Sequence, residues 1–317
     1  MMKIKSTPIA RAMAAKLGID INLVPGSGID GRILIEDIQK FKNSPISGAA
    51  HSNFAPAPVA DNKVITQPSA VAPKATPAPR PAIDRSAHSE AITPIRKAIS
   101  KAMTNSWSNV AYTNLVHEID MTALWDLRSR IKDIVLKSDN VKITFLPYII
   151  KAAAIALRDF PVFTAKYNEA NQTLDYPGVI NVGIAVDTEA GLMVPVINNA
   201  DNLSIVNIAS EVTRLAGAAR NRTIKPAEMK GAGFTITNYG SVGSLFGVPV
   251  INYPELAIGG VGAIIDKPVV KNGQVVPGKV MYLTVAADHR WIDGAVIGRF
   301  ASRIKELLEK PDVLGVY

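Results

Sequence analysis

One histidine of this sequence lies where side-chain chemistry is most readily expected. His289 follows a strand-like apolar run, residues 280–288, and opens a turn that reaches Asp293 and Gly294. The chain has no cysteine, which excludes disulfides, thiolate metal sites and a cysteine nucleophile. No second histidine is near it in the sequence to share a metal. A solitary imidazole in this place indicates a general base that acts on a substrate already close to a good nucleophile, such as a thiol.

The other histidines and a glycine-rich motif are interpreted as structural. His51 and His88 lie in or beside a proline-rich segment, and His117 lies in a strand-like run, so none of the three is expected to be catalytic. The G-x-G-x-x-G pattern at 26–31 has the form of a dinucleotide fingerprint. However, a helical pattern precedes it and the unit is too short for a βαβ fold. Its glycines are expected to make tight turns between two helices.

The elements that must position His289 belong to residues 91–317, where apolar residues recur with helical or alternating periodicity. The expected helices are 93–103, 121–137, 145–157 and 294–309, and the expected strands are 179–187, 192–197, 233–239, 256–265 and 280–288. The stretch 145–157 is apolar nearly all round, which indicates burial. Because strands and helices alternate irregularly, the pattern predicts an α/β (α+β) fold with helices packed on a mixed sheet.

Two shorter parts precede this region. Residues 44–90 hold 8 of the 21 prolines and few bulky apolar residues, which predicts a flexible linker rich in proline and alanine. Residues 1–43 predict a small all-α unit, in which a first helix ends at Gly18 and a second covers 33–38. A unit of this size is barely large enough to fold alone.

Composition narrows the classes of function. With 48% apolar and 20% charged residues, the chain can bury a core of useful size. It has no long apolar run and no signal-peptide pattern, so no membrane association is expected and the predicted location is cytoplasmic. A net charge of +8 suits an anionic partner, such as a CoA phosphate, nucleic acid or an acidic protein surface. Nucleic acid is not expected, because no basic run is interleaved with aromatic residues.

Several segments together resemble one family. The run HRWIDG at 289–294 matches the H-x-x-x-D-G signature of the dihydrolipoamide acyltransferase (E2) components of 2-oxo acid dehydrogenase complexes. Chloramphenicol acetyltransferase shares this signature and the fold. The runs GFTITNYG at 233–240, GLMVPV at 191–196 and TPIRKAI at 93–99 resemble further E2 motifs in the same order and spacing. The resemblance covers 91–317 and implies an acyltransferase domain with a chloramphenicol-acetyltransferase-like, two-layer fold.

The N-terminal unit resembles the peripheral subunit-binding domain of the same proteins. The runs PIAR at 8–11, GID at 18–20 and GSGIDGRI at 26–33 stand where that domain has its helix start, its turn and its G-T-G-x-x-G-R loop. The implied organisation is a binding domain at 1–43, a linker at 44–90 and a catalytic domain at 91–317.

The resemblance implies roles for three residues in catalysis. His289 corresponds to the base that takes the proton from the thiol of CoA or of dihydrolipoamide. Thr237 corresponds to the serine or threonine whose hydroxyl donates a hydrogen bond to the tetrahedral oxyanion; the alternative is a β-branched residue that merely suits a strand. Asp293 is the signature carboxylate, expected to organise the site, and Arg96 is considered as its partner.

Three arginines are assigned to binding by the same resemblance. Arg128 matches a position that contacts CoA phosphate in some relatives, although an exposed helix charge is an equal alternative. Arg11 and Arg32 match basic residues that hold acidic surfaces of the dehydrogenase components E1 and E3. The sequence departs from the family at Ala15, where a second basic residue is expected on the first helix.

The resemblance also implies partners and an assembly. The expected reaction moves an acyl group, acetyl in the first instance, between CoA and dihydrolipoamide. Lipoate would be carried on a lipoyl domain that is not present in this chain and acts in trans. A homotrimer with active sites between subunits, building a 24-mer or 60-mer core, is expected for the family. Two alternatives stay open, namely a non-catalytic scaffold of the complex and a free-standing CoA acyltransferase.

Overall fold

The computed structural model describes residues 6–28, 31–42 and 87–317, and the chain divides into two compact units, Met1–Ile83 and Asp84–Tyr317. Each unit is described by itself. The linker expected at 44–90 lies outside the described residues except for 87–90, which are exposed and have no regular structure, and His51 also lies outside them. None of the described helices has the length and apolar character needed to cross a membrane.

The small unit consists of two helices and a turn around a compact apolar core. Helix α1, Pro8–Lys16, begins at Thr7, whose hydroxyl accepts a hydrogen bond from the Ala10 amide at 3.2 Å. A 3₁₀ turn, Ile21–Leu23, and helix α2, Ile35–Lys42, follow. Their buried side chains are Ala10, Ala14, Val24, Ile33 and Ile38.

Close backbone contacts in the loop between these helices explain why it contains glycines. The Gly28 amide donates to the Arg32 carbonyl at 2.9 Å, and a Cβ atom on Gly26 would collide with the Gly31 carbonyl oxygen. The buried Asp37 carboxylate accepts 2.9 Å hydrogen bonds from the amides of Ser27 and Leu34, which lower its pKa. The glycines therefore form tight turns, as predicted.

A mixed sheet forms the centre of the large unit, with strand order β1-β9-β7-β6-β4-β5 and β8 paired to β9. Strands β4, β6 and β7 are parallel, and the other pairs are antiparallel. The strands are β1 Tyr112–Asp120, β4 Val182–Ile184, β5 Val196–Ile197, β6 Phe234–Asn238, β7 Ala257–Val261, β8 Ile265–Lys271 and β9 Gln274–Asp288. A separate hairpin pairs β2, Lys166–Asn168, with β3, Thr173–Asp175.

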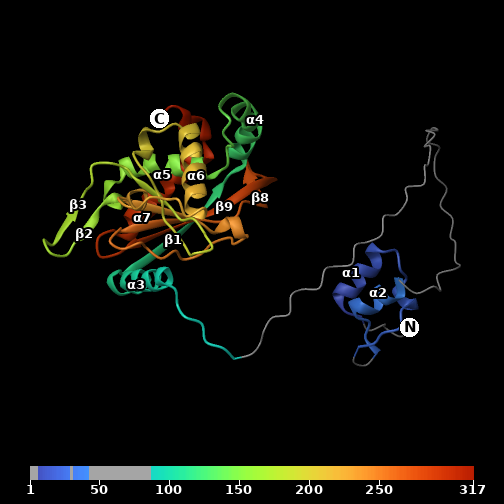
Figure 1. Ribbon diagram of the computed structural model, residues 1–317. Helices are drawn as coiled ribbons and strands as arrows, with labels where there is room; N and C mark the ends of the chain where they lie inside the picture. Colours follow the sequence, from blue (N-terminus) through green and yellow to red (C-terminus); the bar gives the residue numbers. More distant parts are fainter. Residues whose placement is uncertain (1–5, 29–30, 43–86) are drawn as a thin grey trace. The chain divides into compact units, whose positions relative to one another are not determined.

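Helices other than Pro94–Asn109 cover one face of this sheet and bury its main core (Figure 1). The helices of the large unit are α3 Pro94–Asn109, α4 Thr122–Asp139, α5 Leu146–Asp159, α6 Ile205–Arg220 and α7 Gly294–Glu309. Helix α5 is buried over eleven consecutive residues, 147–157, which confirms the burial predicted from its apolar sequence. On the opposite face of the sheet, the buried cluster is small and consists of Ile251, Ile258 and Ala286.

The structure differs from the expected elements in several places. Helix α6 and strands β2, β3 and β8 were not predicted, and the expected strand 179–187 is regular only over Val182–Ile184. Helix α3 continues to Asn109, beyond the expected end at 103. The end of α3 is fixed by tertiary contacts, since the Ser106 hydroxyl bonds the Tyr112 hydroxyl at 2.8 Å and the Ile251 carbonyl.

Candidate active site

The predicted base lies in a turn that joins the longest strand to the last helix. Strand β9 ends at Asp288, and α7 begins at Gly294 with Asp293 as its N-cap residue. The amides of Trp291 and Ile292 both donate to the Asp288 carbonyl at 3.0 Å, which closes the turn. The backbone of His289 is tied to the start of β1, because its amide donates to the Ala111 carbonyl at 2.8 Å.

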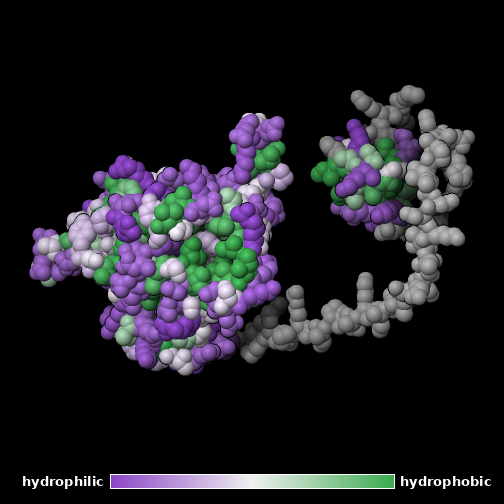
Figure 2. Space-filling view, turned by 90° about the horizontal axis from the view of Figure 1, so that it is seen from above, coloured by the Kyte–Doolittle hydropathy of each residue, from purple (hydrophilic) through white to green (hydrophobic). Residues whose placement is uncertain are grey.

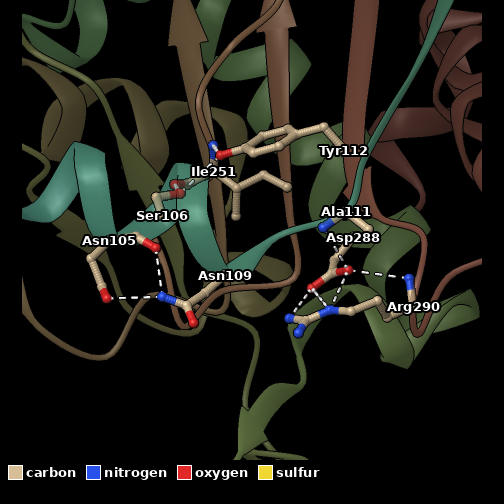
Figure 3. A network of polar contacts seen from close by, with 8 residues as sticks. All are labelled: Asn105, Ser106, Asn109, Ala111, Tyr112, Ile251, Asp288 and Arg290. Carbon is tan, nitrogen blue, oxygen red and sulfur yellow. Dashed lines mark hydrogen bonds and ion pairs between the residues drawn. The ribbon is translucent and has the colours of Figure 1, made fainter.

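A buried carboxylate, that of Asp288, organises this turn (Figure 3). It accepts hydrogen bonds from the Ala111 amide at 3.3 Å and from the Arg290 amide at 3.1 Å. The Arg290 guanidinium also forms an ion pair with it, with Nη2 2.7 Å from Oδ2 and Nε 3.0 Å from Oδ1. The carboxylate, adjacent to His289 in sequence, thus connects the end of β9 with the start of β1 and with the turn itself.

Aromatic contacts hold the outer side of the same turn. The Trp291 ring stacks on the Tyr167 ring of β2 with centroids 4.6 Å apart. The Arg290 guanidinium lies over both rings, at 5.7 Å from Tyr167 and 5.6 Å from Trp291. Cation–π and stacking contacts of this kind restrict the turn from the side of the β2–β3 hairpin.

The two signature side chains of the turn are open to solvent in the single chain. His289 and Asp293 are exposed, and a Cβ atom on Gly294 would lie 4.0 Å from His289 Nε2, so the imidazole leans over the start of α7. Asp293 makes no side-chain capping bond. Within the part of the chain that the structure describes, it forms no ion pair with Arg96, which lies instead beside Glu189 and Arg222.

Thr237 lies on the wall of an apolar pocket on the other side of the sheet from the main core. The pocket has a volume of about 370 Å³. The other residues that line it include Met103, Leu192, Val194, Thr235, Tyr239, Phe246, Val248, Pro249 and Asn252. The hydroxyl of Thr237 therefore faces a space in which an uncharged group could be desolvated.

The structure does not bring Thr237 and His289 together within one chain. Thr237 pairs with Gly260 and Gly260 with Thr284, whereas His289 lies five positions beyond Thr284. At ~3.3 Å per residue along a strand and ~4.8 Å between strands, the two residues are roughly 15–20 Å apart. His289 is also absent from the residues lining the pocket of Thr237.

The remaining predicted residues are the three arginines assigned to binding. Arg128 on α4 is half-buried, donates from Nε to the Ile143 carbonyl at 3.0 Å and covers the Phe145 ring at 4.8 Å. In the small unit, Arg11 and Arg32 are exposed, and Arg11 Nη2 donates to the Ser6 hydroxyl at 3.0 Å.

Comparison with known proteins decides the family. The model of the 2-oxoacid dehydrogenases acyltransferase catalytic domain matches residues 84–316, and that of the e3 binding domain matches residues 4–39. The chain belongs to the 2-oxoacid dehydrogenase acyltransferases. It is 40% identical over 311 residues to the dihydrolipoyllysine-residue acetyltransferase component of the Staphylococcus aureus (strain MRSA252) pyruvate dehydrogenase complex, covering 98% of this chain and 70% of that protein.

Solved structures agree with this assignment. A structure of the Azotobacter vinelandii dihydrolipoamide acetyltransferase aligns with a TM-score of 0.70 and 32% identity, over 75% of this chain and 99% of that one. The cubic core of a pyruvate dehydrogenase multienzyme complex aligns with the same TM-score of 0.70, identity of 32% and coverage of 75% and 99%. These findings confirm the expected family, the mixed sheet with helices and the small E3-binding domain.

Sequence reasoning missed the polar groups that support the site. Asp288 and Arg290 flank His289 and form the ion pair described above. A signal was available in the sequence. Asp288 ends the apolar run VMYLTVAAD, and a carboxylate that is buried with such a run needs a cation or hydrogen-bond donors as partners. Glu255, buried beside the pocket of Thr237, was also missed; it is the lone acidic residue between two apolar runs.

Proposed function

We propose that this acyltransferase moves an acetyl group between dihydrolipoamide and CoA, as the E2 core of a 2-oxo acid dehydrogenase complex. His289 and Thr237 act together across the boundary between two copies of the chain. The two residues lie roughly 15–20 Å apart in one chain, toward opposite ends of strands β6 and β9, so a single copy cannot supply both to one substrate.

One comparison of spacing carries this proposal. In the Azotobacter vinelandii enzyme, a serine, a histidine and an asparagine were investigated for their role in the catalytic mechanism, and the serine precedes the histidine by 52 positions and the asparagine follows it by four. Thr237 precedes His289 by 52 positions, and Asp293 follows it by four. The hydroxyl and the imidazole thus have counterparts of matching chemistry, while Asp293 offers a carboxyl where the relative has an amide.

The residues of this chain can perform the reaction without a covalent enzyme intermediate. His289 Nε2 removes the proton from the attacking thiol, and the thiolate adds to the thioester carbonyl. Thr237 donates its hydroxyl proton in a hydrogen bond to the resulting oxyanion. The protonated His289 then returns its proton to the departing thiolate. General base catalysis contributes about 10²–10⁴-fold, and an oxyanion donor about 10²–10³-fold.

The lining of the pocket supports an acetyl group in preference to succinyl. All residues that line it are uncharged. A succinyl group carries a carboxylate, which is costly to bury unless a cation pairs with it. An acetyl group needs only apolar contact and the hydroxyl of Thr237, and Leu192, Val194 and Phe246 supply the apolar surface.

Binding roles outside the reaction centre complete the proposal. Arg128 is the proposed contact for a CoA phosphate, since its Nε is used internally and its two terminal nitrogens remain for an anion. Arg11 and Arg32, exposed on the E3-binding domain, are proposed to contact acidic surfaces of E3 or E1. The proposed division is 1–43 for this domain, 44–90 for a linker and 91–317 for catalysis, with lipoate supplied by a lipoyl domain and trimers building the core.

Complementation between variants tests the shared site. His289→Ala and Thr237→Ala should each reduce acetyl transfer from acetyl-CoA to free dihydrolipoamide by at least about a hundredfold. Co-expression of the two variants should restore about a quarter of the wild-type rate, because about a quarter of the sites then combine an intact Thr237 with an intact His289 from another copy. His88→Ala, outside the site, serves as the matched control.

Two results would contradict the proposal. Near-wild-type turnover of His289→Ala would remove the base. Failure of co-expressed variants to recover activity, with mixed oligomers demonstrated by differently tagged chains, would show that both groups must come from one copy.

A further inference from the structure

A buried carboxyl that the proposed chemistry does not use lies behind the pocket of Thr237. Glu255 is 3% exposed and follows the loop that forms one wall of this pocket. Its Oε2 accepts a hydrogen bond from the Thr235 hydroxyl at 2.7 Å, and its Oε1 accepts one from the Asn252 amide at 2.8 Å. Both donors line the pocket, so one carboxyl links the strand that carries Thr237 to the opposite wall.

The neighbouring strand is shaped to admit this arrangement. Gly183 of β4 pairs with Thr235 of β6, and a Cβ atom at Gly183 would lie 2.7 Å from the Thr235 hydroxyl oxygen. A side chain at that position would push the hydroxyl away from Glu255. Thr237 lies two residues further along β6 and points to the same side as Thr235. A shift of Thr235 would therefore be transmitted to the hydroxyl proposed to bind the oxyanion.

The surroundings of Glu255 lack the cation that a buried carboxylate normally requires. Within the described ranges, no lysine or arginine forms an ion pair with it. Lys166 of β2 pairs with it through the backbone and exerts only a weak attraction. The carboxylate of Asp288, whose amide donates to the Leu256 carbonyl, is already paired with Arg290. Burial accordingly raises the pKa of Glu255 to about 7.

We propose that Glu255 is a positioning residue that supports acyl transfer in its neutral, protonated form, by donating to the Thr235 hydroxyl while it accepts from Asn252. The proposal rests on the function proposed above. In this form, the carboxyl keeps the two pocket walls joined without a charge. A carboxylic acid, like a hydroxyl, can both donate and accept, so the observed distances suit the neutral group as well as the ionised one.

The ionised form should slow the reaction for an electrostatic reason. Thr235 and Thr237 are two strand positions apart, which is ~7 Å, so the carboxylate would lie roughly 8 Å from the developing oxyanion. At an effective dielectric constant of about 20, two unit charges at this distance repel strongly enough to slow the reaction about thirtyfold. Activity should therefore fall as the pH rises through the range in which Glu255 loses its proton.

The pH profile of Glu255→Gln tests the proposal. Glutamine reproduces the neutral shape, with an amide that donates to Thr235 and an oxygen that accepts from Asn252. We expect kcat for acetyl transfer to match the wild type at pH 6, and to exceed it by up to about thirtyfold at pH 8.5. Glu169→Gln, an exposed substitution of the same kind, should follow the wild-type profile throughout.

The outcomes separate this inference from the proposed function. If the wild type is active and His289→Ala is not, but Glu255→Gln retains the wild-type decline in kcat at alkaline pH, the neutral role of Glu255 is wrong while the acyltransferase mechanism stands. An inactive wild type would instead remove the proposed function. If Glu255→Gln fails to fold, infrared difference spectra of the wild type decide the question. A protonated carboxyl band that is present at pH 6 and lost by pH 8.5 supports the inference, and its absence at pH 6 overturns it.

Discussion

Substitution of Asp288 by asparagine should impair both stability and catalysis, because this carboxylate fixes the turn that carries the proposed base, His289. Asparagine keeps one oxygen, which can still accept from the amides of Ala111 and Arg290. It loses the second carboxylate oxygen, to which Arg290 Nη2 donates at 2.7 Å, and it removes the charge. The guanidinium of Arg290 then faces an amide instead of an anion.

The expected loss of stability follows from the burial of the two partners. Asp288 has a side chain that is 1% exposed, whereas that of Arg290 is 38% exposed. A hydrogen bond to a charged group contributes about 1.5–3 kcal/mol, and breaking a fully buried pair costs more. Because Arg290 can still reach water, we expect a loss of about 2 kcal/mol, equivalent to a decrease of about 4–8 °C in Tm for a unit of this size.

The expected loss of activity follows from the position of His289. Its backbone is held next to Asp288, and a displacement of ~1 Å of a catalytic group can cost about a hundredfold in rate. We therefore expect kcat for acetyl transfer to fall by one to two orders of magnitude, with KM changed much less. Thermal scans and steady-state kinetics on the same preparation measure both effects.

Asp159→Asn is the matched control. Asp159 also pairs with an arginine, Arg303, at 2.9 Å, but its side chain is 44% exposed. An exposed pair contributes less than about 1 kcal/mol, and this one lies away from the turn. If Asp288→Asn shows the same Tm and kcat as Asp159→Asn, the ion pair of Asp288 and Arg290 does not position His289 and the reasoning is refuted.

Three further predictions concern other parts of the chain. Because the pKa of Glu255 is raised to about 7, the folded wild type loses stability as the pH rises from the ordinary carboxyl range toward 7. The stability of Glu255→Gln relative to the wild type should therefore be greater at pH 8 than at pH 4.5, by up to about 3 kcal/mol. Measurements of Tm for both proteins at the two pH values test this. Asp37→Ala should unfold the E3-binding domain, seen as loss of dispersed amide signals by NMR, while acetyl transfer continues. Tyr167→Ala should lower Tm through loss of its stack on Trp291, whereas Tyr167→Phe, which keeps the ring, should not.

Local patterns were sufficient to predict the elements that carry the reactive groups. The apolar run VMYLTVAAD predicted the end of β9, and the stripe of Ile297, Phe300 and Ile304 predicted α7, so the turn between them was placed correctly. The fully apolar α5 was recognised for the same reason. In each case the signal is a run or a periodicity of apolar residues within the segment itself, which needs no knowledge of distant residues.

Features that depend on tertiary contacts could not be predicted in this way. Helix α6 is an exception, because its buried residues Ile208, Ala209, Leu215 and Ala219 follow a helical spacing that the sequence already shows. Strand β8 is half exposed and is stabilised by its pairing with β9. The burial of Glu255 depends on the approach of Thr235, twenty positions earlier in the chain, which no local pattern indicates.

The separation of Thr237 and His289 in one chain is compatible with the proposed closed ring of identical subunits. Each copy would then give its histidine to one site and its threonine to another, and no copy would be complete alone. The surface beside the pocket agrees with this reasoning. Val242, Phe246 and Val248 are 79%, 63% and 59% exposed. On the face of the large unit that is seen from above, Figure 2 also shows an apolar area. Because large apolar side chains gathered at the rim of a pocket usually mark a contact surface, the same loop that shapes the pocket is suited to receive the neighbouring copy that brings the base.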